Sequence, residues 1–386
     1  MRILIMTDCP ADPNSGAAGT VYRTAEALKR LGHEVETVWA DELGRRIRHG
    51  NLHYLLELPL AIRRVLRRKL GKRRYDVVEV SQPHGYLAAA MLRRSALDSV
   101  YIHRSHGFEL RVGRDLAEWR EVYRTPAATS IRQLLSPLMS RALYLNSHAI
   151  VRFADGHIVS ATECADFLRE EMGVATDRIA VVPQAVPDSF LEAGVPMDAN
   201  RLTGVLYVGQ FAFIKAPMIV AEVMNRLSEQ RPDLRFTWVA DASHHGEIGK
   251  LLETRTRERT RLMGWMRQEE LIRVFDSHGI FVFPSFFEGF GKAFLEAMSR
   301  GLCVVAANNG GAHDVIRDGV DGHLVRTGGA KEMVDTCLSL LQDPQRAARM
   351  SRAATESARS YTWRRVAEES ASFYRRRLEA RAGARS

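Results

Sequence analysis

Cysteine is scarce in this 386-residue chain, and its four cysteines lie far apart in the sequence. They form no C-x-x-C pair, so neither a disulfide framework nor a zinc site is expected, and a reduced cytoplasmic protein is the simplest interpretation. No run of eighteen apolar residues occurs, which predicts that no helix spans a membrane. Residues 1–6 (MRILIM) are typical of a first strand and not of a signal peptide.

Two nucleotide-binding fingerprints are also missing. A dinucleotide-binding protein carries G-x-G-x-x-G after its first strand, whereas here Thr7 is followed by Asp-Cys-Pro and Val208 by Gly-Gln-Phe. A Walker A sequence is absent as well. Dinucleotide-dependent oxidoreductases and P-loop enzymes are therefore excluded, although the chain shows the alternation of strands and helices that both classes share.

That alternation of short apolar runs and helical segments predicts an α/β protein with parallel sheets. A helix is expected from about Thr20 to Leu31, with Gly32 as its stop. The polar segment 188–202 is expected to be a linker, so we predict domains at 1–187 and 203–361 and a last helix with a basic tail at 362–386. Strands are predicted at 2–7, 34–38, 75–80, 99–103, 157–160 and 179–182 in the first half, and at 204–208, 236–239, 280–283, 303–306 and 323–326 in the second.

The most informative segment runs from Pro284 to Met298. A predicted strand is followed by a glycine-rich turn and by a helix expected from Lys292 to Arg300, which Gly301 would end. Free backbone N–H groups and the helix dipole converge at such a turn and make it an anion site. Glu288 in the turn and Glu296 inside the helix add two carboxylates, which accept hydrogen bonds from hydroxyl groups. An anionic ligand that also presents sugar or ribose hydroxyls is therefore predicted.

This segment, continued to Val305 and followed by Asn308-Asn309-Gly310-Gly311, closely resembles the donor-site signature of the retaining family-4 glycosyltransferases. The resemblance implies the GT-B fold, with two facing Rossmann-like domains and a C-terminal helix that crosses back to the first domain. It also implies a hexosyltransferase-type enzyme that moves a sugar from a nucleotide diphosphate sugar, of the UDP or GDP type, to an acceptor hydroxyl with retention of the anomeric configuration. No cofactor besides this co-substrate is implied.

The resemblance also assigns roles to residues of the second half. Glu288 would act at the catalytic centre by fixing the sugar hydroxyls, and Glu296 would hold the ribose. Lys215 matches a lysine that binds the diphosphate, whereas Gln210 replaces a family arginine; the lost charge-assisted contact would weaken donor binding by roughly 1.5–3 kcal/mol unless Gln210 or another cation compensates. The diphosphate would lie against the backbone of Gly289, Phe290, Gly291 and Lys292.

Two positions in the first half match as well. His106, in the segment Arg104 to Glu109 after a predicted strand, aligns with a catalytic histidine beside the anomeric carbon. Gly16 aligns with the second of two glycines near the donor phosphates, and Ser15 replaces the first. These matches imply that both halves of the chain contribute to the reaction.

Several alternatives for mechanism and function stay open. Attack on the leaving-group face, with the diphosphate oxygen taking the acceptor proton, fits retention without an obvious nucleophile. A double displacement would need a carboxylate on the opposite face, and only Glu109 lies near His106 in the sequence. No Asp-x-Asp sequence occurs, which favours metal-independent transfer and no metal site. The rival from another class is a non-catalytic GT-B relative that binds a sugar nucleotide or a membrane partner, and Gln210 is its main support.

The net charge of +9 is unevenly distributed, because residues 41–75 hold eleven Lys or Arg against three acids. A basic amphipathic helix is predicted there, of the type that rests on anionic lipid surfaces. Peripheral attachment to the inner face of the membrane is therefore one prediction, with a lipid-linked or glycan acceptor. A merely solvated face and a small-molecule acceptor are the alternative. Nucleic acid is not an expected partner, because no aromatic residues interleave the basic run. The predicted apolar stripe is Leu58, Ile62, Val65, Leu66 and Leu70, and the basic side is Arg63, Arg64, Arg67 and Arg68.

Overall fold

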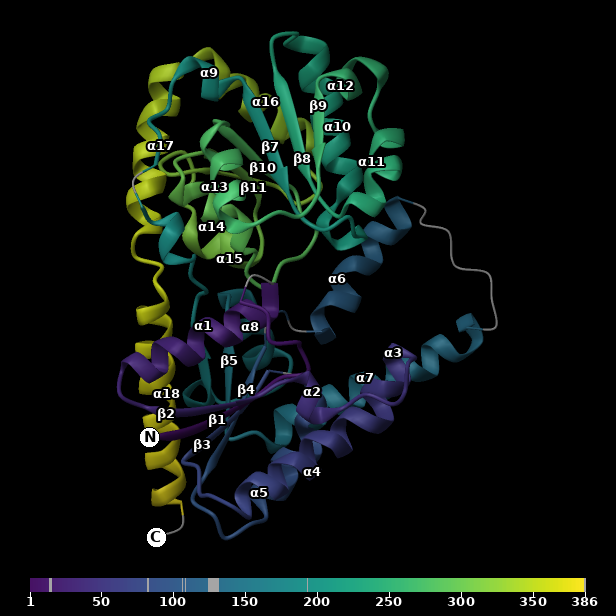
Figure 1. The fold of residues 1–386 in the computed structure, drawn as a ribbon. Helices are drawn as coiled ribbons and strands as arrows, with labels where there is room; N and C mark the ends of the chain where they lie inside the picture. Colours follow the sequence, from purple (N-terminus) through teal and green to yellow (C-terminus); the bar gives the residue numbers. More distant parts are fainter. Residues whose placement is uncertain are drawn as a thin grey trace. The chain divides into compact units, whose positions relative to one another are not determined.

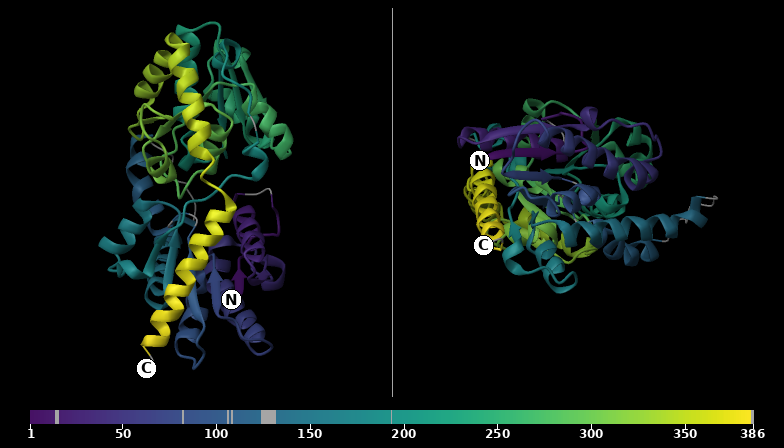
Figure 2. Two further views of the ribbon diagram at one scale, coloured as in Figure 1. Left: turned by 90° about the vertical axis from the view of Figure 1, so that its left-hand side faces the viewer. Right: turned by 90° about the horizontal axis from the view of Figure 1, so that it is seen from below.

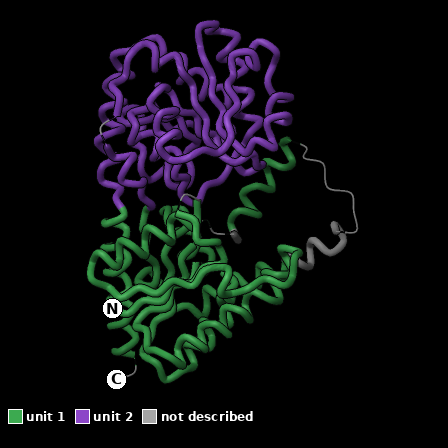
Figure 3. The backbone as a smooth tube through the Cα atoms, in the orientation of Figure 1, with its two compact units in different colours: residues 1–183, 363–386 green, residues 184–362 purple. Residues whose placement is uncertain are grey.

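The computed structural model describes residues 1–13, 16–81, 83–105, 107, 109–123, 132–192 and 194–384. The chain divides into two compact units, which Figure 3 shows in different colours. Unit 1 comprises residues 1–183 together with 363–386, and unit 2 comprises residues 184–362. The C-terminal helix thus belongs to the same unit as the N-terminus, as the resemblance predicted.

Unit 1 is built on a parallel sheet whose described strands follow the order β2-β1-β3-β4-β5-β6. Ile3 on β1 lies opposite Val35 on one neighbouring strand and Val77 on the other, so β1 is an interior strand. Its burial explains the apolar run at the start of the chain. The strands are β1 (Arg2–Met6), β2 (Glu34–Val38), β3 (Val77–Val80), β4 (Val100–Arg104), β5 (Gly156–Val159) and β6 (Ile179–Val181).

Helices cover both faces of this sheet (Figure 1). Side chains of α4 (Leu58–Leu70), α5 (Tyr86–Arg93) and the end of α7 (Arg132–Phe153) form one apolar cluster with strand residues such as Leu4 and Val78. α1 (Gly16–Arg30) packs against α18 (Trp363–Gly383), and α18 also contacts β4. The remaining described helices of the unit are α2 (Ala40–Leu43), α3 (Gly50–Leu52), α6 (Glu109–Val122) and α8 (Thr162–Glu170), with short helical turns η1 (His53–Glu57), η2 (Pro83–Gly85) and η3 (Thr176–Arg178).

A buried polar network attaches α18 to the sheet of unit 1. Arg104 Nε on β4 donates to Glu79 Oε1 on β3 at 2.9 Å. The same guanidinium donates through Nη2 to Ser370 Oγ on α18 at 2.7 Å, and Tyr374 Oη on α18 donates to Glu79 Oε2 at 2.5 Å. Because Glu79 and Arg104 are both buried, the pair depends on these extra hydrogen bonds to compensate its lost hydration. Figure 2 shows α18 as the long C-terminal helix of the unit.

Unit 2 also has a parallel sheet, with described strands in the order β12-β11-β10-β7-β8-β9. An apolar cluster on one face joins β7, β10 and β11 to α13, α14 and α15, and it includes Phe281, Phe283 and Phe294. α10 and α16 pack against each other, and α16 also contacts β11. The strands are β7 (Gly204–Val208), β8 (Arg235–Val239), β9 (Thr260–Met263), β10 (Ile280–Phe283), β11 (Cys303–Ala307) and β12 (His323–Val325). The helices are α9 (Ala199–Leu202), α10 (Pro217–Gln230), α11 (His245–Leu251), α12 (Thr254–Glu258), α13 (Gln268–Asp276), α14 (Lys292–Ser299), α15 (Gly310–Val315), α16 (Ala330–Gln342) and α17 (Pro344–Ala358), with short turns η4 (Asp188–Phe190), η5 (Phe213–Lys215) and η6 (Ala242–His244).

The strands predicted from sequence are present, each to within two residues at either end, and the GT-B class is confirmed. Gly32 and Gly301 have the left-handed φ expected of helix stops, 82° and 71°. β9 was not predicted, because its sequence Thr-Arg-Leu-Met is short and only half-buried at the sheet edge. α1 begins at Gly16, four residues earlier than the predicted start near Thr20.

The segment 188–202 is not the linker that its polarity suggested. It belongs to unit 2, where Phe190 and Arg201 are buried and short helical turns form. Arg201 Nη2 donates to the carbonyl of Arg300 at 2.9 Å, and Asp198 caps α9 by accepting from the Arg201 N–H at 2.7 Å. Polar side chains here serve buried hydrogen bonds, which composition alone does not distinguish from solvation.

The prediction that the apolar stripe of α4 faces lipid is wrong. Leu58, Ile62, Val65 and Leu66 are at most 2% exposed and lie in the core of unit 1, with Leu70 packed against them. An amphipathic helix of a globular protein buries its apolar side in the same way, so the sequence pattern could not separate the two cases. Arg63, Arg64, Arg67 and Arg68 are exposed. In the described part of the chain, no helix is long and apolar enough to cross a membrane.

Candidate functional site

The turn between β10 and α14 brings two of the predicted site residues into contact. Lys215 Nζ lies 2.6 Å from Glu288 Oε1, and Ser285 Oγ donates to the same oxygen at 2.7 Å. The Glu288 side chain is 6% exposed and the Lys215 side chain 24%. Within the described residues, Glu288 Oε2 makes no hydrogen bond and Lys215 uses one of its three donors, so each can still bind a ligand.

A left-handed residue sets the position of Lys215. The lysine ends η5, and Ala216 after it has a φ of 51° before α10 begins at Pro217. Such a conformation costs a residue with a Cβ roughly 1–2 kcal/mol, and strained residues of this kind cluster at functional sites. The Phe286 N–H donates to the carbonyl of Ile214 at 2.9 Å, which joins the lysine loop to the glutamate turn.

The same turn offers backbone donors. The N–H groups of Gly289, Phe290 and Gly291 form no hydrogen bond within the described part of the chain, and the first two residues are buried. Gly291 has a φ of 89°, and Lys292 after it begins α14, with Glu296 one turn further on and partly buried. Buried donors without a partner are costly, so they indicate a site that a ligand or water completes. Their place at a helix N-terminus favours an anion.

Two glycines at the turn between β11 and α15 pack closely against the turn that holds Glu288. A Cβ on Gly310 would lie 2.6 Å from the carbonyl oxygen of Glu288, and one on Gly311 would lie 2.4 Å from the Phe290 ring. Asn309 Nδ2 donates to the carbonyl of Ser285 at 2.9 Å. The Asn-Gly-Gly sequence is therefore needed because the backbones of two turns meet here, and its close packing fixes the position of Glu288.

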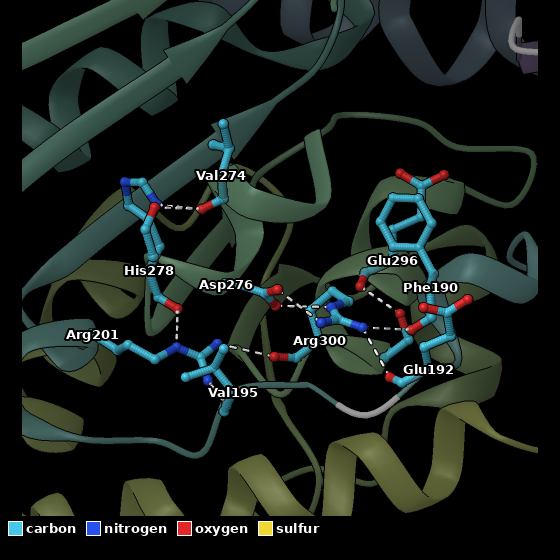
Figure 4. A network of polar contacts seen from close by, with 11 residues as sticks. Phe190, Glu192, Val195, Arg201, Val274, Asp276, His278, Glu296 and Arg300 are labelled. Carbon is cyan, nitrogen blue, oxygen red and sulfur yellow. Dashed lines mark hydrogen bonds and ion pairs between the residues drawn. The ribbon is translucent and has the colours of Figure 1, made fainter. Parts of the chain in front are cut away.

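A buried guanidinium fixes the far end of α14 (Figure 4). Arg300, directly after the helix, forms two 2.8 Å hydrogen bonds with the carboxylate of Asp276 at the end of α13. Its Nη1 donates to the carbonyl of Glu192 at 2.9 Å. Arg201 Nε donates to the carbonyl of His278 at 3.2 Å, and burial lowers the pKa of His278 to about 4, so its imidazole is neutral. The network holds α14, and hence the turn at its N-terminus, against the core.

The other residue predicted near the diphosphate is placed differently. Gln210 follows β7 and is exposed, and it makes no hydrogen bond to Lys215 or Glu288. The buried Tyr207 lies beneath this loop: a Cβ on Gly209 would be 2.5 Å from Tyr207 Oη. Burial raises the pKa of Tyr207, and the charge of Glu288 raises it further, so the phenol stays protonated. Gln210 is thus free to turn toward a ligand, whereas Gly209 is fixed by close packing.

The predicted residues of unit 1 give less direct information. His106 lies outside the described residues; its neighbour Ser105 follows β4 and donates through its N–H to the carbonyl of Ile158 at 2.9 Å. Gly16 begins α1, and a Cβ there would meet nothing within 4 Å. A Cβ on Gly19 would lie 2.7 Å from the carbonyl oxygen of Pro13. The fold therefore requires glycine at position 19, whereas packing against the described residues does not require it at position 16.

The sequence placed Ser285 and Asn309 within the donor-site signature but assigned neither a role, and it did not single out Ala216. Ser285 and Asn309 are polar residues just past the ends of β10 and β11, which is where open α/β sheets bind ligands. Their position just after these strands is the sequence signal that could have identified them as site residues. Among the described residues, no group of three or more His, Cys, Asp or Glu is placed to hold a metal ion.

Comparison with known proteins agrees with this geometry. A family model described as Glycosyltransferase Family 4 matches residues 14–190, and one described as Glycosyl transferases group 1 matches residues 203–343. The D-inositol 3-phosphate glycosyltransferase of Kribbella flavida is 28% identical over 255 residues, which cover 62% of this chain and 60% of that protein. The chain spans between 52% and 60% of the length of four curated relatives of this name.

Solved structures share the fold over nearly the whole chain. Sucrose-phosphate synthase from Thermosynechococcus elongatus has a TM-score of 0.78 at 18% identity, with 98% of this chain and 100% of that one covered. The Anabaena protein HepE, solved in complex with UDP and glucose, has a TM-score of 0.67 at 17% identity, with 96% and 98% covered. At these identities the likeness establishes the architecture of both units.

Proposed function

The chain belongs to the family-4 glycosyltransferases, and we propose that it is an active, retaining enzyme of this family that transfers a hexosyl group from a UDP- or GDP-sugar to an acceptor hydroxyl. The observation that carries the proposal is the contact of Lys215 with the buried Glu288 beside the turn before α14, where the N–H groups of Gly289, Phe290 and Gly291 have no acceptor among the described residues. A cation, an oriented carboxylate and a helix N-terminus together suit a ligand that joins a diphosphate to a sugar.

In the proposed reaction, the bond between the anomeric carbon and the diphosphate oxygen breaks while the acceptor oxygen bonds to that carbon. The leaving diphosphate gains negative charge, which Lys215 and the N–H groups of Gly289, Phe290 and Gly291 stabilise. Because they are oriented before the reaction, these donors act as a preorganised electrostatic site; removal of one donor of this kind typically costs about 10²–10³ in kcat. Glu296, one turn into α14, binds the ribose.

Glu288 orients the sugar in this scheme. Its Oε1 is held by Lys215 and Ser285, which leaves Oε2 to accept from a sugar hydroxyl. The acceptor attacks on the face from which the diphosphate leaves, and its proton passes to the departing phosphate oxygen, so configuration is retained and no metal is needed. His106 and Gly16 keep the roles that the family resemblance gives them.

A panel of nucleotide sugars tests the proposal. UDP- and GDP-sugars are added to the purified protein with EDTA, and donor hydrolysis and transfer are followed, with the anomeric configuration of the product read by NMR. Retention of configuration, with wild-type activity in EDTA, is expected. The non-catalytic alternative predicts that a nucleotide sugar raises the melting temperature without being consumed. Since seven relatives are named D-inositol 3-phosphate glycosyltransferases, inositol phosphates are the first acceptors to test.

We further propose that unit 1 contacts an anionic membrane by the exposed face of the continuous segment α3, η1 and α4, and not by the apolar stripe that the sequence suggested. Leu56 and Leu60 are 57% and 56% exposed, and they precede the exposed arginines at helical spacing. Leucines that enter the interface and arginines that meet anionic headgroups are the two components of such binding. This surface would suit a lipid-linked acceptor. It consists of Leu52, Leu56, Leu60, Arg63, Arg64, Arg67 and Arg68.

Vesicle co-sedimentation tests this surface. Binding is expected to rise with the fraction of anionic lipid and to fall with salt, because exposed charges are screened beyond about 8 Å at physiological ionic strength. Replacement of the four arginines by glutamine, and separately Leu56→Ser with Leu60→Ser, should each reduce binding without changing donor affinity. Equal binding of the wild type and both variants would show that the surface is only solvated.

A further inference from the structure

A cavity in unit 1 is surrounded by arginines that the sugar-transfer reaction does not use. Its volume is about 310 Å³. Arg93 at the end of α5, Arg178 in η3, and Arg377 and Arg381 on α18 line it, with Asp155 as the one acidic residue of the lining. Even when the carboxylate of Asp177, which pairs with Arg377, is counted with Asp155, four cations face two carboxylates. This leaves an excess of positive charge around a space large enough for a small anion.

The protein's own groups satisfy these arginines only in part. Arg381 Nη1 donates to Asp155 Oδ1 at 2.9 Å, and Arg377 Nη1 donates to Asp177 Oδ2 at 2.6 Å. The side chains of Arg377 and Arg381 are 12% and 10% exposed. Their Nε groups are buried and have no acceptor among the described residues. A buried charged donor without an acceptor is unfavourable, so the protein alone does not fully satisfy these two guanidinium groups.

Arg93 and Arg178 bind carbonyl groups and have no carboxylate partner among the described residues. Arg93 Nη1 donates to the carbonyl of Arg152 at 2.6 Å, and Arg178 Nη2 donates to that of Ala154 at 2.6 Å. Burial lowers the pKa of Arg178, and the positive charges of Arg377 and Arg93 lower it further. Like charges therefore repel one another across the cavity, and a bound anion would relieve that repulsion.

The cavity lies at the amino ends of strands of the unit 1 sheet, whereas the transfer reaction is expected at the carboxyl ends. Asp155 directly precedes β5 and Arg178 directly precedes β6, so both mark the amino ends of parallel strands. Gly16 and His106, by contrast, come after the carboxyl ends of β1 and β4. The arginine cavity is therefore a separate site within unit 1.

A neighbouring hollow indicates which kind of substituent an anionic ligand could have. Arg93 and Arg178 also line a second cavity of about 660 Å³. Much of its remaining lining is apolar, including Leu145, Phe153 and Met172. A ligand with an anionic head among the arginines and an apolar substituent would fill both spaces.

We propose that this cavity binds a phosphate monoester, whose dianion accepts hydrogen bonds from Arg93, Arg178, Arg377 and Arg381 and whose substituent lies in the adjacent hollow. Planar guanidinium groups match phosphate oxygens in bidentate geometry. The bound phosphate connects α18 to α5 and to η3, and so strengthens the attachment of the C-terminal helix to its own unit. A soluble phosphomonoester and the headgroup of phosphatidic acid share this chemistry.

Calorimetry and thermal unfolding of the full chain test the site, with chloride, inorganic phosphate and hexyl phosphate compared at constant ionic strength. Saturable binding of hexyl phosphate is expected, at least tenfold tighter than inorganic phosphate, with a rise in the melting temperature. Arg178→Gln and, separately, the more exposed Arg93→Gln should weaken it at least tenfold. Arg375→Gln, on the exposed side of α18 and outside the lining, is the matched control and should bind as the wild type does.

Lys215→Gln separates this site from the donor site, because it removes a diphosphate ligand and should leave hexyl phosphate binding unchanged. Vesicles that contain phosphatidic acid, compared with vesicles of phosphatidylglycerol, then distinguish a lipid source from a soluble one. Protection by chloride equal to that by phosphate would overturn the proposal. So would unchanged binding in both Arg178→Gln and Arg93→Gln, or loss of binding in Lys215→Gln alone.

Discussion

Lys215 and Glu288 are 73 positions apart in the sequence, yet Nζ of one lies 2.6 Å from Oε1 of the other. The contact joins the turn after β7 to the turn after β10, two adjacent strands of unit 2. Each residue keeps hydrogen-bonding capacity for a ligand, so the pair holds a sugar-binding carboxylate and a phosphate-binding cation at a fixed separation. Replacement of Glu288 and replacement of Lys215 should therefore impair the enzyme in different ways.

Glu288→Gln is expected to lower kcat by about 10²-fold or more with little change in donor affinity, because the amide keeps the shape but loses the charge that orients the sugar. Lys215→Met is expected to weaken donor binding by roughly 1.5–3 kcal/mol, the typical contribution of a charge-assisted hydrogen bond. Steady-state kinetics and donor calorimetry separate the two effects. Turnover close to wild type in Glu288→Gln would remove Glu288 from the catalytic centre.

The same pair predicts a non-additive effect on stability. Lys215→Met leaves the buried Glu288 carboxylate with Ser285 as its remaining hydrogen-bond partner among the described residues, which is expected to cost about 1–3 kcal/mol. Glu288→Gln added to Lys215→Met removes that uncompensated charge, so the double variant should be more stable than Lys215→Met alone. Urea unfolding of the four proteins completes the cycle. Additive losses would mean that the ion pair is not coupled.

Gln210→Arg tests how the donor site manages without the family arginine. Gln210 is exposed, so an arginine can be accommodated without disturbing the core, and its charge would face the diphosphate. We expect the donor dissociation constant to fall about tenfold, equivalent to ~1.4 kcal/mol. Gln210→Leu is the control of similar size and should not tighten binding. A weaker donor complex in Gln210→Arg would show that another cation already occupies that role.

How much of this site was predictable depends on the range of the interactions. The strand, turn and helix around Glu288 follow from local patterns, and the left-handed φ of Gly301 was expected from its position. The contact of Lys215 with Glu288 and the support from Asn309 arise from the order of strands in the sheet, which a single sequence does not specify. Leu58 to Leu66 show the opposite limit, since the same amphipathic pattern describes a core helix and a membrane helix.

Gly16 and Gly19 form a natural pair of variants on α1. A Cβ on Gly16 would meet nothing within 4 Å, whereas one on Gly19 would lie 2.7 Å from the Pro13 carbonyl oxygen. Gly16→Ala should therefore leave the melting temperature unchanged but raise the KM for the donor, if this residue borders the phosphates. Gly19→Ala should destabilise unit 1 by about 1–3 kcal/mol through overpacking. A wild-type donor KM in Gly16→Ala would exclude contact with the donor.

Unit 1 should lose stability in mild acid because of buried histidines. Burial, together with the smaller effect of a neighbouring histidine, lowers the pKa of His84 to about 4 and that of His103 to about 3. The unfolded chain protonates histidine near pH 6.5. Between that pH and the folded values it binds more protons than the native state does, so stability falls as the pH is lowered through this window.

The slope of this loss is about 1.4 kcal/mol per pH unit for each fully shifted histidine, and it should be absent above about pH 7.5. His84→Phe removes one titrating group and keeps a ring to stack on Tyr54, whose centroid lies 4.9 Å from that of His84. Its melting temperature should therefore fall less steeply between pH 6.5 and about pH 4 than that of the wild type. Parallel pH profiles for the two proteins would show that His84 is protonated without cost in the native state, and that its burial does not govern the acid sensitivity of unit 1.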